Sequence, residues 1–206
     1  METKSRGRPR SYDPEQVLER ALHAFWKGGF SGTSLDTLAL VTGLNRPSLY
    51  AGLGDKRTIY IKAMRYFQKY AKTEFGKALE HKATDRSFAD VIVRYLQTAL
   101  EVDGYHENIN LSGCAVISTA MADALADNEI QAVLKEVLTE MDKQLYQRLK
   151  LAQENLELPH GTDIDALAFL MTSAAHSIGI RARAGLPLQQ IEEMFTSLGI
   201  MLCPYR

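Results

Sequence analysis

The chain has 206 residues, and 46% of them are apolar, which is enough to bury a core in a small domain joined to a larger one. Only two cysteines occur, Cys114 and Cys203, so the composition excludes a disulfide framework and favours a cytoplasmic protein. No run approaches the ~18 apolar residues of a membrane span, and no apolar stretch follows the charged N-terminus, so neither a membrane protein nor a secreted one is expected.

The two parts of the chain carry opposite charge, although the formal net charge is only −1. Residues 1–72 contain 13 Lys and Arg against 6 Asp and Glu, whereas residues 73–206 contain 11 against 19. A basic head on an acidic body fits a head that faces a polyanion, because neutralising phosphates releases counterions. The alternative is that the charges cluster by chance, and a DNA-binding motif in the head would argue against it.

Helical periodicity runs through almost every segment, and no alternation of apolar and polar residues is long enough for a sheet, so the sequence predicts an all-α fold. Residues 1–11 are expected to form a basic, flexible arm. Arg6, Arg8 and Arg10 alternate there with small residues, as in arms that enter the minor groove beside other helix-turn-helix units. A tail that only improves solubility is the alternative.

The segments after the arm have the lengths of a helix-turn-helix unit. A first helix is expected to begin at the N-cap Asp13, with Pro14 at its first position, and to end at Gly28. Two short helices follow, over about 35–42 and 46–51, joined by a tight connection. This order of one longer and two short helices predicts a DNA-binding head.

A fourth helix is expected to begin at the N-cap Asp55 and to continue to His81. The head therefore covers residues 12–58, and a helical effector-binding and dimerisation domain covers 59–206. Further helices are predicted over about 87–103, 113–126, 129–156, 163–184 and 188–202, separated by Gly and Pro stops.

Three short runs in the head recur at the spacing of one known family. Phe25 to Leu38 contains aromatic-x-x-Gly-aromatic and Thr-Ser-Leu, Leu44 to Tyr50 ends in Ser-Leu-Tyr, and Gly54 to Arg57 contains Asp-Lys. By these runs the chain resembles the DNA-binding domain of the TetR family of transcriptional repressors, and in particular its AcrR-like regulators. The resemblance implies a homodimeric repressor on double-stranded operator DNA.

The chain departs from the family pattern at the end of the third helix. Leu53 stands where a Phe is usual, and Ala51 and Gly52 fill positions that are often larger and polar. The fold is expected to tolerate both changes.

The third helix is the element that a helix-turn-helix places in the major groove, where its N-terminal residues meet base edges. Arg46 is the best candidate for reading a guanine, because a guanidinium can bond O6 and N7 together. For Tyr50 simple core packing is the alternative. The predicted groove contacts are Asn45, Arg46, Pro47, Ser48 and Tyr50.

Contacts to the DNA backbone are expected from two places in the head. Thr33 and Ser34 lie at a helix start, where backbone N–H groups and hydroxyls suit a phosphate oxygen. For Lys56, in the first turn of the fourth helix, the resemblance implies a phosphate contact. A solvated surface lysine is the alternative.

The two C-terminal helices combine apolar and small residues and can pack against their symmetry copies as a four-helix interface, which is where the family usually places it. Closure of a monomeric core is the alternative. A dimer is also needed because one short recognition helix reads too few base pairs. The apolar residues concerned are Leu167, Leu170, Met171, Ala174, Ala175 and Ile178, and then Leu188, Ile191, Met194, Phe195, Leu198 and Met201.

Aromatic, Met and other apolar side chains of the body are the candidates for an effector cavity, although such residues usually form plain core. His176 on an apolar helix is more often a hydrogen-bonded core residue than a ligand. The candidate effector-binding residues are Phe67, Tyr70, Tyr95, Cys114, Ile117, Met121, Met141, Leu145 and His176.

Cys114 carries a second hypothesis. If Ser112 caps a helix there, the thiol lies in its first turn, where the macrodipole favours a thiolate and should lower the pKa. Cys114 would then serve as a redox or electrophile sensor. An inert small hydrophobe is the alternative.

No enzymatic constellation is found: no Gly-rich phosphate loop follows a strand, and no His-x-x-x-His pair occurs. No metal or other cofactor is expected. Three interpretations remain: a repressor that a small-molecule or redox effector releases from a palindromic operator, a constitutive DNA-binding protein without a sensor, and a small helical enzyme.

Overall fold

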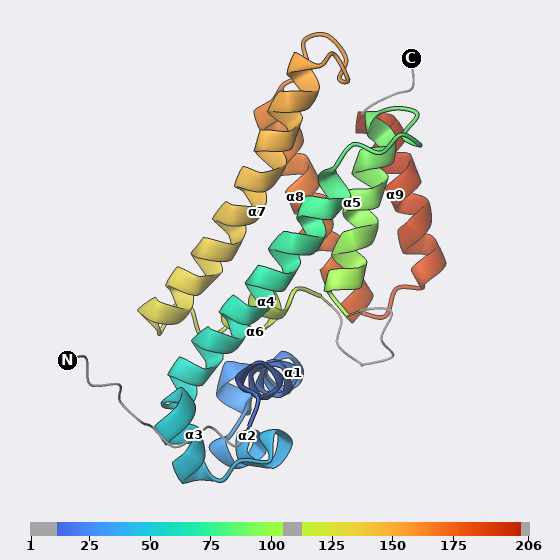
Figure 1. Cartoon of the computed structure of the whole chain (residues 1–206). Helices are drawn as coiled ribbons and strands as arrows, with labels where there is room; N and C mark the ends of the chain where they lie inside the picture. The colour runs from blue at the N-terminus through green and yellow to red at the C-terminus, as the bar shows by residue number, and fades with distance from the viewer. Residues whose placement is uncertain (1–11, 105–112, 203–206) are drawn as a thin grey trace, which may run out of the picture.

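The computed structural model describes residues 12–104 and 113–202 of the chain, and all regular elements in these residues are helices (Figure 1). The predictions made for Arg6, Arg8, Arg10, Ser112 and Cys203 lie outside the described residues. The helices of the described part are α1 (Pro14–Gly32), α2 (Leu35–Thr42), α3 (Arg46–Leu53), α4 (Lys56–Leu79), α5 (Phe88–Val102), α6 (Ala115–Ala120), α7 (Asn128–Glu154), α8 (Ile164–Arg183) and α9 (Leu188–Leu202).

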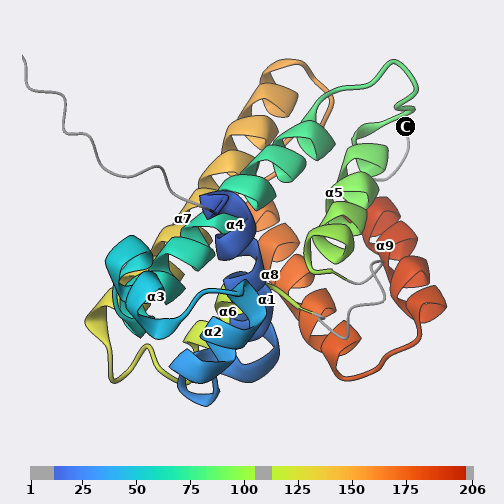
Figure 2. The same ribbon diagram turned by 60° about the horizontal axis from the view of Figure 1, so that its bottom comes forward.

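The head consists of α1, α2 and α3 packed on the first turns of α4 (Figure 2). The Asp13 side chain accepts from the backbone N–H of Glu15 at the start of α1, and Gly29 interrupts that helix with φ 72° and ψ 172°. Gly43 ends α2 in the left-handed conformation, which glycine adopts without a steric cost. The predicted range of α2 is therefore confirmed, whereas α1 continues past the expected end at Gly28 to Gly32 across the kink at Gly29, and α3 is two residues longer than expected.

Helix α4 connects the head to the body, and its 24 residues extend over ~36 Å. Its first turns pack on α1, and its remaining length packs between α5 and α7. The buried stripe of α4 includes Ile59, Met64, Phe67 and Phe75. Head and body thus share one continuous core.

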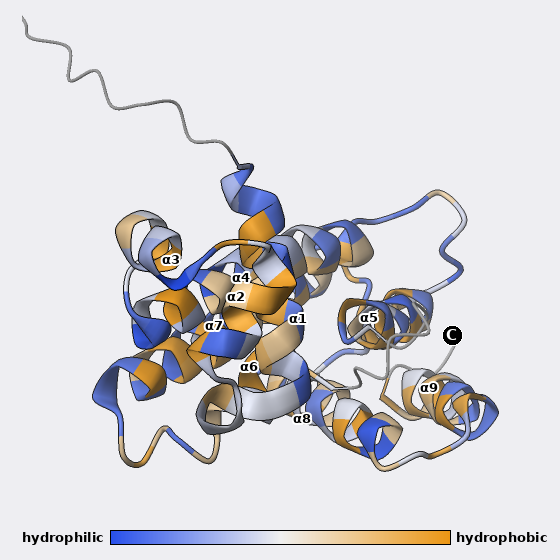
Figure 3. Ribbon diagram, turned by 90° about the horizontal axis from the view of Figure 1, so that it is seen from below, coloured by the Kyte–Doolittle hydropathy of each residue, from blue (hydrophilic) through white to orange (hydrophobic). Residues whose placement is uncertain are grey.

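The body is a layered helical bundle in which α5 lies between α4 and α9, and α7 packs against α4 and α8 (Figures 1 and 2). Viewed from below, the helices carry both hydrophobic and hydrophilic residues along their length (Figure 3). This pattern is the amphipathic periodicity on which the all-α prediction rested.

The helix predicted over 113–126 is the one element that differs clearly. Only Ala115–Ala120 is helical, and residues 121–126 form turns. Met121 and Leu125 are 63% and 93% exposed, so continued helix would find no apolar surface to cover.

Candidate DNA-binding surface and effector cavity

The recognition helix α3 packs on the head core through one face and is exposed to solvent at its N-terminal end. Asn45 Oδ1 accepts from the Ser48 backbone N–H at 2.9 Å and so caps the helix, while Leu49 and Leu53 are buried in the head core. Arg46 and Pro47 are exposed, and Tyr50 is 49% exposed, which excludes core packing as its main role. The groove face predicted from the sequence is thus accessible.

Arg46 has a partner inside the head. Its guanidinium makes a two-point ion pair with Asp36 on α2: Nε donates to Oδ1 at 2.7 Å, and the terminal nitrogen donates to Oδ2. These hydrogen bonds lower the pKa of the Asp36 carboxyl. Both side chains are exposed, so the pair can open when a better acceptor approaches.

Gly52 is explained by its neighbour. A Cβ there would lie 2.0 Å from the Tyr12 hydroxyl oxygen, so a larger residue at this position would have to displace the end of the Tyr12 side chain. The departure from the family pattern at this position is therefore paired with a tyrosine that precedes α1.

The two hydroxyl residues predicted to meet phosphate differ in the structure. Ser34 is exposed and caps α2, its Oγ accepting from the Thr37 N–H at 3.0 Å. Thr33 is 2% exposed, and its hydroxyl donates to the carbonyl oxygens of Gly29 and Ala24. The prediction for the Thr33 side chain is therefore wrong: the hydroxyl closes the kink after Gly29 and does not face outward.

Lys56 is the first residue of α4, directly after the N-cap Asp55. Its ammonium lies 4.6 Å from the centroid of the Phe30 ring and donates to the Ser31 carbonyl oxygen at 3.5 Å. These contacts hold the charge beside the end of α1.

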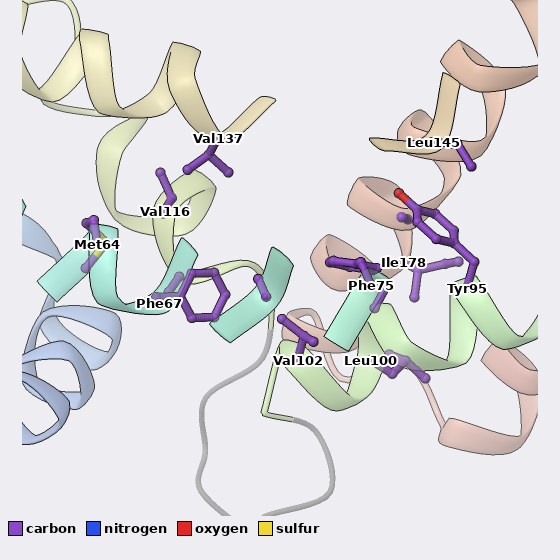
Figure 4. Close-up of a cluster of buried hydrophobic side chains, with 14 of the residues drawn as sticks. Met64, Phe67, Phe75, Tyr95, Leu100, Val102, Val116, Val137, Leu145 and Ile178 are labelled. Carbon is purple, nitrogen blue, oxygen red and sulfur yellow. The ribbon is translucent and has the colours of Figure 1, made fainter. Parts of the chain in front are cut away.

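A cavity of about 30 Å³ lies in the body between α4, α5, α7 and α8. Of the nine residues predicted to line an effector cavity, Phe67, Cys114, Met141 and His176 do line it. Its other lining residues are Gln68, Ala71, Lys72, Phe75, Ala99, Val102, Asp103, Val137, Glu140, Gln144 and Ala175. Figure 4 shows Phe67, Val102 and Val137 among the side chains that meet here.

The remaining five predicted residues do not line this cavity. Tyr95 and Leu145 are fully buried in the packing beyond it, where the Tyr95 ring lies 5.0 Å from that of Phe75 (Figure 4). Ile117 is half-buried on α6, whereas Tyr70 and Met121 are exposed. Helical spacing indicated that these residues could face the interior, but it could not predict where the packed helices leave a cavity.

Asp103 is the lining residue that sequence reasoning missed. It lies at the C-terminal end of α5 and is 6% exposed, whereas an aspartate at a helix end would be expected to be exposed to solvent. Burial raises the pKa of its carboxyl well above the usual value, and the backbone N–H of Cys114 donates to it. Gly179 on α8 permits this packing, because a Cβ there would lie 2.4 Å from the carboxyl oxygen.

The expectation for the Cys114 thiol is wrong. Cys114 precedes the first residue of the short α6 and makes no capping hydrogen bond with its side chain. Burial, followed by the nearby Asp103, raises the pKa of this thiol to about 12. Desolvation thus outweighs the helix dipole on which the prediction rested.

The cavity is linked directly to the head. The Trp26 indole N–H donates to the Gly113 carbonyl oxygen at 2.8 Å, and its ring lies 5.3 Å from the cavity-lining Phe67. Tyr60 on α4 and Thr119 on α6 make a second buried hydrogen bond of 2.7 Å. A change in the cavity wall can therefore reach α1.

Only part of the apolar set on α8 and α9 faces outward. Leu167, Met171, Ala175 and Ile178 are buried within the protomer, and so are Ile191 and Phe195. A second stripe remains partly or fully exposed: Leu170, Ala174 and Ser177 on α8, and Met194, Leu198 and Met201 on α9. Phe169 and Ile180, at 71% and 61% exposed, add to it.

Two other kinds of site were sought in the described residues. No helix there is long and apolar enough to cross a membrane. No group of three or more His, Cys, Asp or Glu side chains in the same residues is arranged to hold a metal ion.

The comparisons with known proteins agree on one kind of protein. No protein-family model matches the chain. Over 193 residues, 93% of this chain and 89% of the relative, it is 28% identical to the HTH-type transcriptional repressor ComR of Escherichia coli strain K12. It is 25% identical over 188 residues, 91% and 94% of the two chains, to the uncharacterized HTH-type transcriptional regulator YezE of Bacillus subtilis strain 168.

Solved structures share the whole fold. A cysteine variant of the TetR family regulator CifR, complexed with 26-base-pair operator DNA, has a TM-score of 0.84 at 20% identity and covers 96% of this chain and 100% of its own. Reduced Escherichia coli NemR has a TM-score of 0.73 at 16% identity, covering 92% and 96%. The nine described helices thus have the fold of the TetR family regulators among the solved structures, and the chain is similar over most of its length to helix-turn-helix transcriptional regulators.

Proposed function

We propose that this protein is a homodimeric, cytoplasmic repressor of transcription, not an enzyme, and that a small-molecule effector releases it from a palindromic operator. One observation carries the proposal: α3 is fixed by buried Leu49 and Leu53 while it presents Arg46, Pro47 and Tyr50 outward. The similarity to ComR, named a repressor, and to CifR bound to operator DNA supports it.

In the head, residues 12–58, different residues contact the bases and the phosphates of the DNA. Arg46 leaves Asp36 and reads a base edge, with Pro47, Ser48 and Tyr50 beside it in the major groove. Ser34 and Lys56 hold backbone phosphates from the flanking helix starts, and Asn45 keeps α3 capped. The ion pair with Asp36 holds the guanidinium in an ordered position until DNA replaces the carboxylate.

Dimerisation uses the outward stripe of α8 and α9. Leu170, Ala174 and Leu198 lie on it, with Phe169 and Ile180 at its side. Exposed apolar side chains on two adjacent helices gain by burial against a second copy. Two heads related by a two-fold axis then meet half-sites ~34–36 Å apart.

The effector enters the cavity between α4 and α7. Its volume of about 30 Å³ holds only a few atoms, so a larger effector must displace the walls. Phe67 is one of these walls and contacts Trp26 in the head, so displacement is transmitted to α1. Effector binding thus changes the spacing of the two heads and weakens operator binding.

Selection from a pool of random duplexes with the full-length protein tests the proposal. We expect enrichment of a palindrome with half-sites about one helical turn apart, bound by a dimer in sedimentation analysis. The matched control, Arg46→Ala, should enrich a weaker motif that has lost one base preference per half-site. Failure to enrich any motif would contradict a sequence-specific repressor.

A further inference from the structure

Asp103 is a buried carboxyl group of the cavity without a cationic partner among the described residues. Its carboxyl is 6% exposed, and the Cys114 backbone N–H is the group that donates to it. The cavity's single lysine, Lys72, is paired with Glu140, with 2.5 Å between the ammonium and the carboxylate. Among the described residues, no Lys, Arg or His forms an ion pair with Asp103.

The histidine that lines the cavity does not supply a balancing positive charge. His176 has a buried Nε2 with no hydrogen-bond partner in the described structure, and burial lowers its pKa, so the imidazole is neutral at pH 7. The charges of Lys72 and Glu140 neutralise each other. Ionisation of Asp103 would therefore give the cavity a net charge of one negative unit. A buried carboxylate of this kind is costly unless an opposite charge accompanies it.

The walls around Asp103 are apolar and partly aromatic. Phe67 and Phe75 are buried at 3% and 4% exposure, and Val102, Val137 and Met141 complete the lining near them. Aromatic faces attract cations, and the attraction grows when water is excluded. The same walls would bind an apolar molecular body by the hydrophobic effect.

We infer that the cavity binds a small organic cation, an ammonium group on an apolar body, with Asp103 as its counter-charge and Phe67 and Phe75 beside it. The inference rests on the proposed function, because it names the chemical class of the effector. An anionic ligand would face the Asp103 carboxyl while the cavity's lysine is already paired with Glu140, and a neutral ligand of the same shape can form a hydrogen bond with Asp103 but no ion pair.

The geometry also provides a signal that is independent of DNA. The Gly113–Cys114 peptide group donates its N–H to Asp103 and accepts the Trp26 indole N–H at its carbonyl oxygen. Trp26 is the only tryptophan of the chain, and its ring touches Phe67. A cation that pairs with Asp103 should therefore change the fluorescence of Trp26.

Three probes of nearly equal size and different charge test the inference: benzylamine, benzyl alcohol and benzoate. Each is titrated at pH 7 into the full-length protein without DNA, with Trp26 fluorescence and the melting temperature as readouts. We expect saturable binding of benzylamine, at least about tenfold tighter than that of benzyl alcohol, and no binding of benzoate. Asp103→Asn should abolish the preference, whereas Glu154→Gln, at an exposed carboxylate on α7, should retain it.

Equal affinity for benzylamine and benzyl alcohol in the wild-type protein would overturn the inference, even if Asp103→Asn failed to fold. Retention of the preference in a folded Asp103→Asn protein would overturn it too, as would the absence of benzylamine binding at millimolar concentration. Operator binding is measured separately on the selected duplex. Benzylamine that binds at Asp103 without releasing the operator would contradict the proposed function and leave the inference intact.

Discussion

The indole N–H of Trp26 in the head donates to the Gly113 carbonyl oxygen in the body, a buried hydrogen bond of 2.8 Å between residues 87 positions apart. The peptide group that accepts this bond also contacts Asp103 in the cavity through its N–H. Because the Trp26 ring packs edge-on against Phe67, the head meets the cavity wall at two neighbouring points. One of these points is the loop before α6, and the other is Phe67 on α4.

Trp26→Phe should lower the free energy of unfolding by ~1–3 kcal/mol, because it leaves the buried Gly113 carbonyl oxygen without its donor and removes ring area. Urea denaturation followed by circular dichroism measures the loss. The control Tyr50→Phe changes an exposed side chain and should cost less than about 0.5 kcal/mol. Equal losses in the two variants would contradict the role assigned to the hydrogen bond.

Arg46→Ala and Lys56→Ala should weaken operator binding in different ways. Lys56→Ala removes a phosphate contact, so it should weaken all duplexes alike and reduce the salt slope by about one. Arg46→Ala should mainly erode the preference for the selected operator over random DNA, by ~1–3 kcal/mol per half-site. Fluorescence anisotropy at several salt concentrations distinguishes these outcomes, and Asp36→Ala serves as a control that should keep the preference. The same pattern for both variants would refute the assignment of base and phosphate contacts to different residues.

Asp103→Asn should stabilise the protein increasingly as the pH rises. Because burial raises the pKa of the Asp103 carboxyl, the folded state favours the neutral form, and wild type loses stability once the pH passes the carboxyl pKa of the unfolded chain, about 4. The loss continues until the pH exceeds the raised pKa of the folded state. Calorimetry between pH 4 and 9 should therefore show a melting-temperature advantage of the variant that grows with pH.

Asp85 provides the control of opposite sign. Its carboxylate pairs with Arg94 at 2.6 Å, and this partner lowers its pKa. Asp85→Asn should therefore lower the melting temperature at neutral pH, and the deficit should shrink as the pH falls through the lowered pKa. A pH-independent difference for Asp103→Asn would show that its carboxyl is not desolvated.

The helices could be predicted from the sequence because period, caps and stops are local properties of the chain. Asp55, for example, caps α4 by accepting from the Thr58 N–H at 2.8 Å, as a residue of its type at a helix start should. Leu125 shows the limit of such reasoning: its periodicity suggested a longer helix, yet no other element covers it. Whether an apolar stripe is covered depends on partners far away in the sequence.

The binding residues divide along the same line. The exposure of Arg46 and Tyr50 was predictable because the helix-turn-helix fixes which end of α3 faces outward, and their contacts with DNA remain a prediction. Thr33 was not, because its hydroxyl bonds to carbonyl groups released by the kink at Gly29. Asp103 could not be found by pattern, since its burial depends on the close approach of Gly179 from α8.

Leu170→Glu should split the dimer. Leu170 is 51% exposed on the outer stripe of α8, and a glutamate there would be buried unpaired between two copies. Sedimentation velocity at micromolar concentration should show monomers, and operator affinity should fall. Leu151→Glu on α7, where the leucine is 53% exposed, is the matched control and should remain dimeric. A monomeric wild-type protein would end this assignment.

Cys114 should be chemically inert in the folded protein. With a pKa of about 12, its thiol is ionised in about one molecule in 10⁵ at pH 7, whereas the unfolded thiol, with a pKa near 8.5, is ionised in a few per cent. Because the thiolate is the species that reacts, a disulfide reagent should modify native Cys114 at least about a hundredfold more slowly than the urea-unfolded chain. The measurement uses a Cys203→Ser background so that one thiol is followed.

Mild peroxide should likewise leave operator binding of this protein and of a Cys114→Ser variant unchanged. Rapid native modification, with operator release that Cys114→Ser abolishes, would instead make the thiol a sensor and require that the cavity open far enough to hydrate it.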